Sequence, residues 1–348
     1  MCKRDFKLDL AKGFLIVLVV LGHCVQYSFG PEWLISEKFF KDVIFKTIYS
    51  FHMPLFMLIS GYLFYNSNQK EFRHLIISKL KAIGIPILSY IFLCNMILYS
   101  FFLRHGNVIG IIEHYCKSVF FGMTLWFLLS LLLMILTVAI LTRILKKKYL
   151  LHIAMFTIFI ASLLAPDSII PSVHKFMFPF FCIGYITKQN DIPLYSSSQH
   201  KFLLGTLSLL SIFAICWFNK DTYIYTSGIC IVGNYAEQFQ IDCKRIVIAL
   251  IVSYTFMQYI NILARHRNVL TKKVSKLGQM SLFIYGMNTV FNIYYSKLTS
   301  ILSINFHFNY LIPITITLCF LLICCWLYKL LEKTKFTCIA LLGKNCVH

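Results

Sequence analysis

The sequence predicts an all-α membrane protein, a polytopic bundle of about ten transmembrane helices with both termini in the cytoplasm. Of its 348 residues, 59% are apolar and 13% are charged, and this charged share is about half that of a typical soluble domain. A soluble protein cannot cover so much apolar surface, whereas a lipid bilayer solvates it. The apolar residues also gather in repeated runs of about twenty, the length that crosses the hydrocarbon core.

Hydropathy along the chain defines the spans in order. The first two contain the polar residues treated below. The fifth and sixth are short, and Pro166 and Pro171 between them predict a tight outer turn. The whole chain, 1–348, is predicted to form one membrane domain without a soluble appendage. The predicted spans are 8–29, 43–65, 82–103, 119–142, 149–165, 172–187, 202–218, 245–264, 280–302 and 309–331.

The distribution of lysine and arginine sets the predicted orientation. With the N-terminus placed inside, the inner loops carry 23 of the 33 basic residues, and the outer loops carry ten, Lys175 and Arg245 among them. Basic residues gather on the cytoplasmic side of membrane proteins, so this asymmetry favours an even number of spans. The net charge of +20 therefore reflects topology and does not indicate a nucleic-acid partner.

Other features narrow the kinds of site that we expect. The first apolar stretch is longer than a signal-peptide core, and no small-residue cleavage site follows Phe29, so it is predicted to remain as a span. The thirteen cysteines form no CxxC pair, and no HExxH or tight His/Asp/Glu cluster occurs, so neither a metal nor a bound cofactor is predicted. The outer loop 219–244 alternates polar and aromatic residues, which fits a hairpin, a lid over an outward-facing site or a plain surface loop.

Three ionisable residues share one side of the first span. At about 100° per residue, Lys12 and His23 lie about 20° apart around the helix, and Asp9 lies about 60° from Lys12. Lys12 and Asp9 sit near the inner boundary, where an interface lysine with an i,i+3 acidic partner is an equally good interpretation. His23 lies about 16 Å further along, past the midplane. Burial of an ionisable group in the membrane is costly, so His23 is a structural histidine with satisfied partners or, as we favour, a functional one.

The second span places another histidine at nearly the same depth. It runs from outside to inside, and His52 lies beside Pro54, which removes a backbone donor and is expected to loosen the helix there. Broken helices in mid-membrane usually line a cavity. Gly61 is expected to let another helix approach closely. His23 and His52 can therefore meet across two antiparallel helices.

Four sets of residues form recognisable motifs. They are Asp9-x-x-Lys12-Gly13 with Val19-Val20-Leu21-Gly22-His23, Ser50-Phe51-His52-Met53-Pro54-Leu55-Phe56 with Ser60-Gly61-Tyr62-Leu63-Phe64, Leu125-Trp126-Phe127-Leu128, and Leu277-Gly278-x-x-Ser281-Leu282-x-Ile284-Tyr285. In these motifs the chain resembles the acyltransferase family 3 proteins, which are integral-membrane O-acyltransferases of surface carbohydrates, and among them the fucose 4-O-acetylase-like branch. The resemblance covers essentially the whole chain, and its first two motifs are specific.

The resemblance implies a donor and a set of roles. The donor would be acetyl-CoA or another acyl-CoA, used as a co-substrate from the cytoplasm, where the basic inner face attracts its phosphates. His23 would be the catalytic residue, as a general base or a transient acyl carrier. Lys12 would hold a donor phosphate or carbonyl, with Asp9 orienting it. Family members often carry arginine at the position of Lys12, and lysine keeps the charge without the bidentate fork.

The implied acceptor is a hydroxyl group of a cell-surface or lipid-linked carbohydrate, and the membrane lipids are a further expected partner. His52 would assist His23 or bind this acceptor. Trp126 and Tyr285 can stack on a sugar face, although both residue types also serve as plain packing or interface residues. Family members commonly carry histidine where this chain has Asn288, so no role of that histidine transfers, and Asn288 is expected to make a polar contact between helices.

Three functions fit these observations. A multi-pass enzyme of a bacterial inner or plasma membrane, transferring acetyl groups to carbohydrate, is the first. A secondary transporter or flippase with a His/Lys/Asp proton relay is the second. The third is a non-catalytic subunit of a polysaccharide export system. No internal repeat of the kind found in many transporters is evident.

Overall fold

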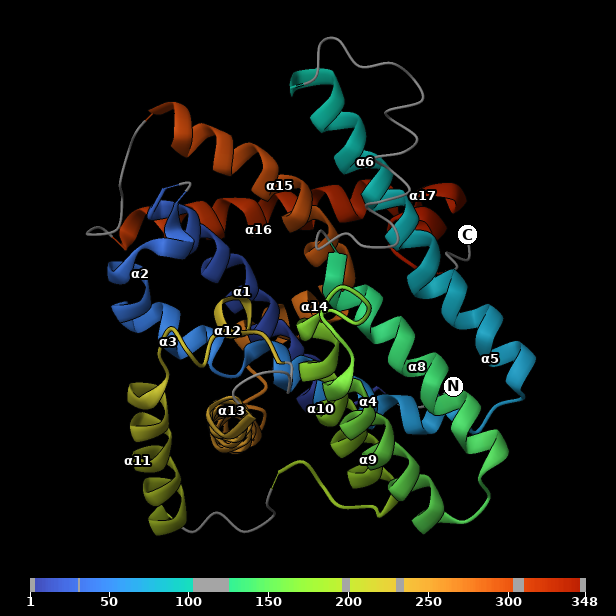
Figure 1. The fold of residues 1–348 in the computed structure, drawn as a ribbon. Coiled ribbons are helices and arrows are strands. Elements are labelled where there is room, and N and C mark those ends of the chain that lie inside the picture. Colours follow the sequence, from blue (N-terminus) through green and yellow to red (C-terminus); the bar gives the residue numbers. More distant parts are fainter. Residues whose placement is uncertain are drawn as a thin grey trace.

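The computed structural model describes residues 4–30, 32–102, 125–195, 201–229, 235–302 and 310–344 (Figure 1). Helices and the loops that connect them account for all of these residues, and no strand occurs among them. This confirms the predicted all-α class. Residues 103, 119–124 and 309 of the predicted spans, and 230–234 of the predicted outer loop, lie outside the described ranges.

Each predicted span overlaps one helix or, for 43–65, two, and shorter helices lie in several of the loops. The helices are α1 (Phe6–Ser28), α2 (Glu37–Lys41), α3 (Val43–Tyr49), α4 (His52–Asn68), α5 (Phe72–Lys79), α6 (Ile85–Phe102), α8 (Trp126–Ile144), α9 (Lys148–Leu164), α10 (Ser172–Gln189), α11 (Lys201–Trp217), α12 (Ile224–Ser227), α13 (Tyr235–Leu263), α14 (Val269–Gln279), α15 (Ser281–Leu302), α16 (Leu311–Leu331) and α17 (Lys335–Ala340). A 3-10 turn, η1 (Trp33–Ile35), precedes α2, and a π-helical turn, η2 (Leu80–Gly84), joins α5 to α6.

Within the described residues, six helical stretches are long and apolar enough to cross a membrane: α1, α3 with α4, α5 with α6, α8, α13 and α16. The apolar helices α9 and α11 are shorter, with 17 residues each. The protein is therefore a helical membrane protein. The count of ten spans and the cytoplasmic placement of both termini remain predictions.

Glycines let two pairs of helices touch through their backbones. A Cβ atom on Gly61 of α4 would lie 2.0 Å from the carbonyl oxygen of Phe181 in α10, and one on Gly184 of α10 would lie 1.9 Å from that of Leu58. Helix α14 contacts α1 in the same way, since a Cβ on Gly278 would lie 1.9 Å from the carbonyl oxygen of Asp9. The expected close approach at Gly61 is confirmed. These contacts fix the height at which the polar residues of α1 and α4 lie.

The second predicted span is interrupted, and the break lies before Pro54 rather than at it. Helix α3 ends at Tyr49, and α4 begins at His52 after Ser50 and Phe51. Pro54 then falls in the first turn of α4, where its missing N–H leaves no hydrogen bond unmade. Its ring would clash with the carbonyl group four residues earlier, that of Ser50, if one straight helix ran through. The loosening therefore places His52 at a helix start.

The predicted outer loop 219–244 is wrong over its second half. Helix α13 begins at Tyr235, ten residues before the predicted span. The hydropathy profile does not indicate this start because the first turns of α13 are polar. Their polar groups pair with one another within the helix. Gln238 donates a hydrogen bond of 3.0 Å to Asp242, and Asp242 forms an ion pair with Arg245. The described part of the loop contains α12 and no hairpin strand.

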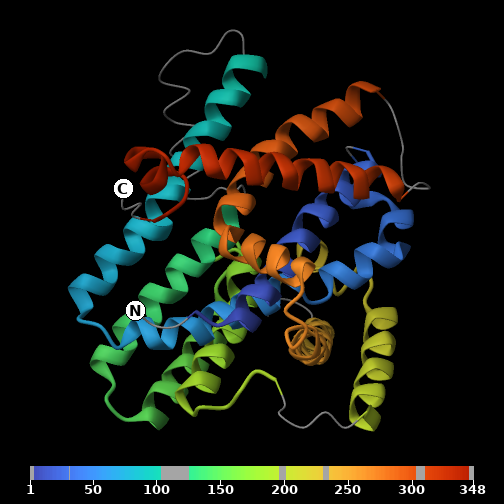
Figure 2. The same ribbon diagram turned by 180° about the vertical axis from the view of Figure 1, so that it is seen from behind.

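Seen from front and back, the helices that carry the first two motifs lie near the middle of the molecule (Figures 1 and 2). Helices α15 and α16 lie across one end, and α1 contacts both of them. Helices α5 and α6 form a long rod at one flank, with α11 at the other, and α13 is viewed end-on between them. This arrangement encloses α1 and α4, so their polar residues face protein.

Candidate functional site

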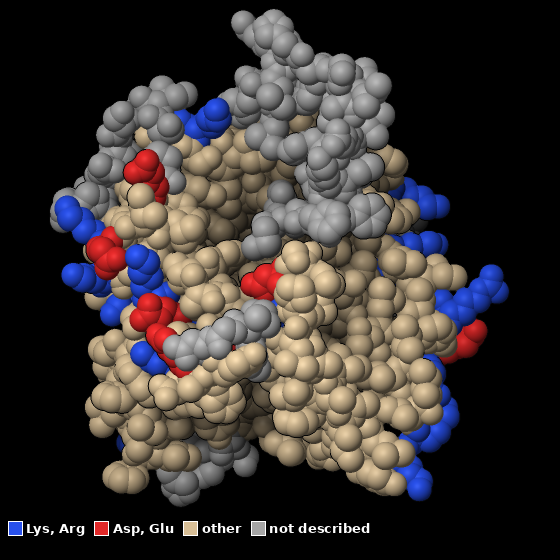
Figure 3. Space-filling model, viewed as in Figure 1, with Lys and Arg blue, Asp and Glu red and all other residues tan. Residues whose placement is uncertain are grey.

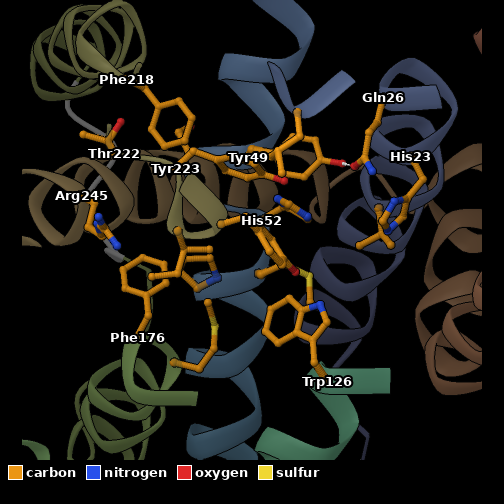
Figure 4. A pocket seen from close by; sticks show the side chains of 18 of the residues that line it. His23, Gln26, Tyr49, His52, Trp126, Phe176, Phe218, Thr222, Tyr223 and Arg245 are labelled. Atoms are coloured by element: carbon orange, nitrogen blue, oxygen red, sulfur yellow. Dashed lines mark hydrogen bonds between the residues drawn. The ribbon is translucent and has the colours of Figure 1, made fainter. Parts of the chain in front are cut away.

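A cavity of about 240 Å³ lies where α1, α4, α8 and α15 meet the loop around α12. We call it the histidine cavity. Figure 4 shows His23 and His52 on its wall, with Trp126 and Tyr223 beside them and Arg245 at the far end. The polar and aromatic residues that line it are His23, Gln26, Trp33, Tyr49, Ser50, His52, Trp126, Phe176, Phe218, Thr222, Tyr223, Tyr225, Arg245 and Tyr285.

His23 lies on α1 and presents its ring to this cavity. Gly22 lets α3 come close at this level, since a Cβ there would lie 3.2 Å from the ring of Tyr49. Tyr49 donates a hydrogen bond of 2.7 Å to Oε1 of Gln26, one turn beyond His23. The Nδ1 atom of His23 is buried, and no group in the described part of the chain forms a hydrogen bond with it. An imidazole nitrogen can donate or accept a hydrogen bond according to the tautomer of the ring.

His52 lies in the same cavity with one ring nitrogen already engaged. Its Nδ1 atom is 2.6 Å from the carbonyl oxygen of Ile48. A carbonyl group only accepts, so Nδ1 carries the proton, and in the neutral ring Nε2 keeps its lone pair. The carbonyl group of Ile48 is available because α3 ends there and the helix breaks before His52. The ring of Tyr49 contacts His52 edge to face at 5.1 Å. His23 and His52 thus line the same cavity, from two consecutive helical segments.

Lys12 and Asp9 occupy a separate position on the same face of α1. Lys12 Nζ forms a 2.9 Å ion pair with Asp9, which also accepts a 3.2 Å hydrogen bond from Gln279. Lys12 lines a second cavity of about 150 Å³, which we call the lysine cavity. Asp9 lines neither cavity, and its carboxylate joins Lys12 to Gln279.

The two cavities adjoin. Val19, Met53 and Tyr285 line both of them. Besides these three and Lys12, the lysine cavity is lined by Ile16, Phe56, Ser60, Ile83, Phe127, Leu128, Leu131, Ser281 and Leu282. These three side chains therefore lie between the cavity that Lys12 lines and the cavity that the two histidines line.

Trp126 and Tyr285 both lie on the histidine cavity, as the acceptor-site interpretation requires. The Trp126 ring contacts Tyr225 edge to face at 6.3 Å. The Tyr285 hydroxyl accepts a hydrogen bond of 3.4 Å from the backbone N–H of Phe127. That N–H is in the first turn of α8 and has no partner within the helix. Tyr285 therefore supports the start of α8, and with it Trp126.

Sequence reasoning missed the residues that the α12 region contributes. Thr222, Tyr223, Ile224 and Tyr225 all line the histidine cavity. Tyr223 is only 3% exposed, and its burial raises the pKa of the phenol well above the ordinary value, so it stays a hydrogen-bond donor. The alternation of aromatic and polar residues in 219–229 was the available signal; the structure has no strand in these residues and places four of them on the cavity.

Arg245 was also missed as a site residue, because its positive charge was assigned to an outer loop. It is 1% exposed and lines the histidine cavity.

Asn288 is buried as well. Its side-chain oxygen forms no hydrogen bond with any residue that the structure describes. The expected polar contact between helices is therefore not found at that oxygen.

Basic side chains gather at the margins of the molecule in Figure 3, around a largely neutral and hollowed middle.

Comparisons with known proteins agree with this geometry. Residues 5–330 match the family model of the acyltransferase domain, Acyl_transf_3. The nodulation protein NolL of Sinorhizobium fredii is 33% identical over 233 residues, and that of Mesorhizobium japonicum is 29% identical over 232 residues. These alignments cover 64% and 66% of this chain and 60% of each relative, so the chain spans less than two thirds of either protein. No solved structure matches the chain. The family model matches nearly the full length of the chain, and the described helices include six stretches long and apolar enough to cross a membrane; this chain belongs to the acyltransferase family.

Proposed function

We propose that this protein transfers an acetyl group from acetyl-CoA to a hydroxyl group of a carbohydrate, as an O-acetyltransferase. The observation that carries the proposal is the junction of the two cavities. His23 and His52 line one cavity, Lys12 lines the other, and three residues are common to both. A transferase of this kind needs a base between a donor and an acceptor, and the two histidines lie on the acceptor side of that junction.

The donor enters from the lysine cavity in this proposal. The ammonium group of Lys12 attracts the phosphates or polarised carbonyl groups of acetyl-CoA. The cavity beyond it is narrow and mostly apolar, which suits the uncharged arm that ends in the thioester. Asp9, held by Gln279, keeps Lys12 in place. The thioester carbon then reaches the junction at Tyr285.

The reaction is a single displacement at that carbon. His23 takes the proton of the acceptor hydroxyl group while its oxygen attacks the thioester carbonyl carbon. A carbon–oxygen bond forms and the carbon–sulfur bond breaks. The CoA thiolate leaves and receives the proton that His23 had taken, so the enzyme returns to its starting state. His52, with its lone pair on Nε2, accepts a hydrogen bond from the acceptor and orients it.

Aromatic side chains around the histidines favour a carbohydrate as the acceptor. Trp126, Tyr223 and Tyr225 line the same cavity as His23. Aromatic faces pack against the apolar C–H face of a sugar, and tyrosine hydroxyls bond its polar groups. The relatives come from bacteria, and we place the protein in a bacterial cell membrane.

Transfer of radiolabelled acetyl from acetyl-CoA to glycan tests the proposal. Membranes containing the wild-type protein are compared with membranes containing His23→Ala at matched protein level. Loss of a general base lowers the rate by about 10²- to 10⁴-fold. Unchanged transfer by His23→Ala would remove His23 from the reaction.

A second measurement separates the base from the acyl carrier. Labelled acetyl-CoA is added without acceptor, and the protein is examined for bound label after denaturation. A base leaves the protein unlabelled, whereas an acyl carrier retains label that His23→Ala loses. A transporter would transfer no label to glycan in either experiment and would accumulate a substrate in response to the proton gradient.

A further inference from the structure

Two fully buried cations lie apart from the histidines, in the region that sequence analysis assigned to outer loops. Arg245 on α13 and Lys175 on α10 are each only 1% exposed. Burying a charge is costly unless it is paired and hydrogen-bonded. Their partners therefore indicate what these residues hold in place.

Arg245 holds the chain around α12. It donates hydrogen bonds to the carbonyl oxygens of Gly228, at 2.7 Å, and Asp221, at 3.3 Å, and to the hydroxyl oxygen of Ser227. Its Nε lies 3.4 Å from Asp242 on its own helix. The planar guanidinium group, with five N–H donors in a fixed fork, suits such a set of acceptors, and lysine does not.

Lys175 holds the same stretch at its end. It donates to the carbonyl oxygens of Ile229, at 3.3 Å, and Ala165, at 2.5 Å, and forms a 2.9 Å ion pair with Asp167. The backbone N–H of Ile229 donates to the Ser172 hydroxyl group at 2.6 Å. Both buried cations thus bind main-chain carbonyl groups of residues Asp221–Ile229, which we call the partition segment.

The partition segment separates two spaces. Thr222, Tyr223, Ile224 and Tyr225 line the histidine cavity. Ile224 and Tyr225, together with the rest of the segment to Gly228, also line an open hollow of about 450 Å³. Arg245 reaches the histidine cavity from the side opposite His23 (Figure 4). The segment contributes nothing to the lysine cavity.

We propose that Arg245 is a positioning residue for the carbohydrate acceptor: by fixing the partition segment it sets the acceptor side of the histidine cavity. The inference rests on the proposed function and deepens it. Arg245 takes no part in proton transfer and touches the donor route nowhere. Loosening the segment therefore weakens acceptor binding and leaves donor binding and the chemical step as they are.

Steady-state kinetics of acetyl transfer test this with Arg245→Lys and Ser227→Ala. Arg245→Lys keeps the charge beside Asp242 but cannot reach three acceptors, and Ser227→Ala removes one bond without changing charge. Arg267→Lys is the matched control, because Arg267 is exposed and lies far along the chain before α14. We expect acceptor KM to rise about tenfold in Arg245→Lys, the loss expected for one charge-assisted hydrogen bond, and less in Ser227→Ala. The KM for acetyl-CoA and kcat at saturating acceptor stay at the wild-type value.

Hydrogen exchange gives a readout that does not depend on activity. The amides of Gly228 and Ile229 are expected to exchange faster in Arg245→Lys and Ser227→Ala than in Arg267→Lys. Unchanged exchange, an unchanged acceptor KM, or an equal rise of both KM values would overturn the proposal. If Arg245→Lys does not fold, Ser227→Ala decides by the same criteria. Absence of transfer by the wild-type protein would instead count against the proposed function, and the exchange experiment would still decide the role of Arg245.

Discussion

Gly61 lies where α4 and α10 touch through their backbones, and an alanine there measures how firmly this contact positions the site. The added Cβ atom would lie 2.0 Å from the carbonyl oxygen of Phe181, about 1.4 Å inside an ordinary contact of 3.4 Å. The obstacle is a helix backbone, so the two helices must separate. Overpacking of this kind destabilises a protein by about 1–3 kcal/mol.

The same displacement reaches the histidine cavity. His52 lies nine residues before Gly61 on α4, about 13.5 Å along the helix, and a rigid helix shifts as a whole. A displacement of about 1 Å at a reacting centre lowers a rate by about 100-fold. We therefore expect Gly61→Ala to lose about two orders of magnitude in acetyl transfer and to unfold at a lower temperature.

Gly205→Ala is the matched control. Gly205 lies on α11, and a Cβ atom there meets no atom within 4 Å. Alanine favours a helix over glycine by about 1 kcal/mol, so the control should be as stable as the wild type or more so, with full activity. Both variants are compared by labelled acetyl transfer and by thermal unfolding in detergent. If Gly61→Ala behaves like Gly205→Ala in both assays, the backbone contact does not position His52 and the reasoning fails.

Three further predictions concern individual side chains. Lys12→Met should raise the KM for acetyl-CoA about tenfold and leave the KM for the acceptor unchanged. Lys12→Arg keeps the positive charge and should have the wild-type KM for acetyl-CoA. A rise in the KM for the acceptor instead would refute the assignment of the lysine cavity to the donor. His52→Asn keeps a donor for the carbonyl group of Ile48 but loses the acceptor Nε2. The variant should therefore fold normally and transfer acetyl slowly. Full activity would show that His52 has only a structural role. Tyr285→Phe removes the hydroxyl group that accepts from the N–H of Phe127. The free energy of unfolding should fall by about 1 kcal/mol, and kcat should change little. A large fall in kcat would show that the Tyr285 hydroxyl group takes part in the reaction.

Much of the site could be predicted because its signals are local in the sequence. His23 and Lys12 share one side of α1 by helical period alone, and the structure places them on adjoining cavities. His52 could be matched in depth to His23 because the two helices follow one another. Pro54 predicted a disturbed helix, although the break falls before it, at Ser50, where its ring would clash.

The sequence by itself determined the membrane class, the helical segments and the face of α1 that carries His23. These features depend on residues that are close to one another in the chain, through the local composition and the helical period. Only the tertiary structure decided the burial of Arg245 and its hydrogen-bond partners. Hydropathy treats a charge as exposed, but its burial depends on partners from other segments, here the carbonyl groups of Asp221 and Gly228. Lys175 is the same case, since its partner Ile229 lies 54 residues away. The wall that residues Thr222–Tyr225 give the histidine cavity is held by such distant pairs, and no local pattern encodes them.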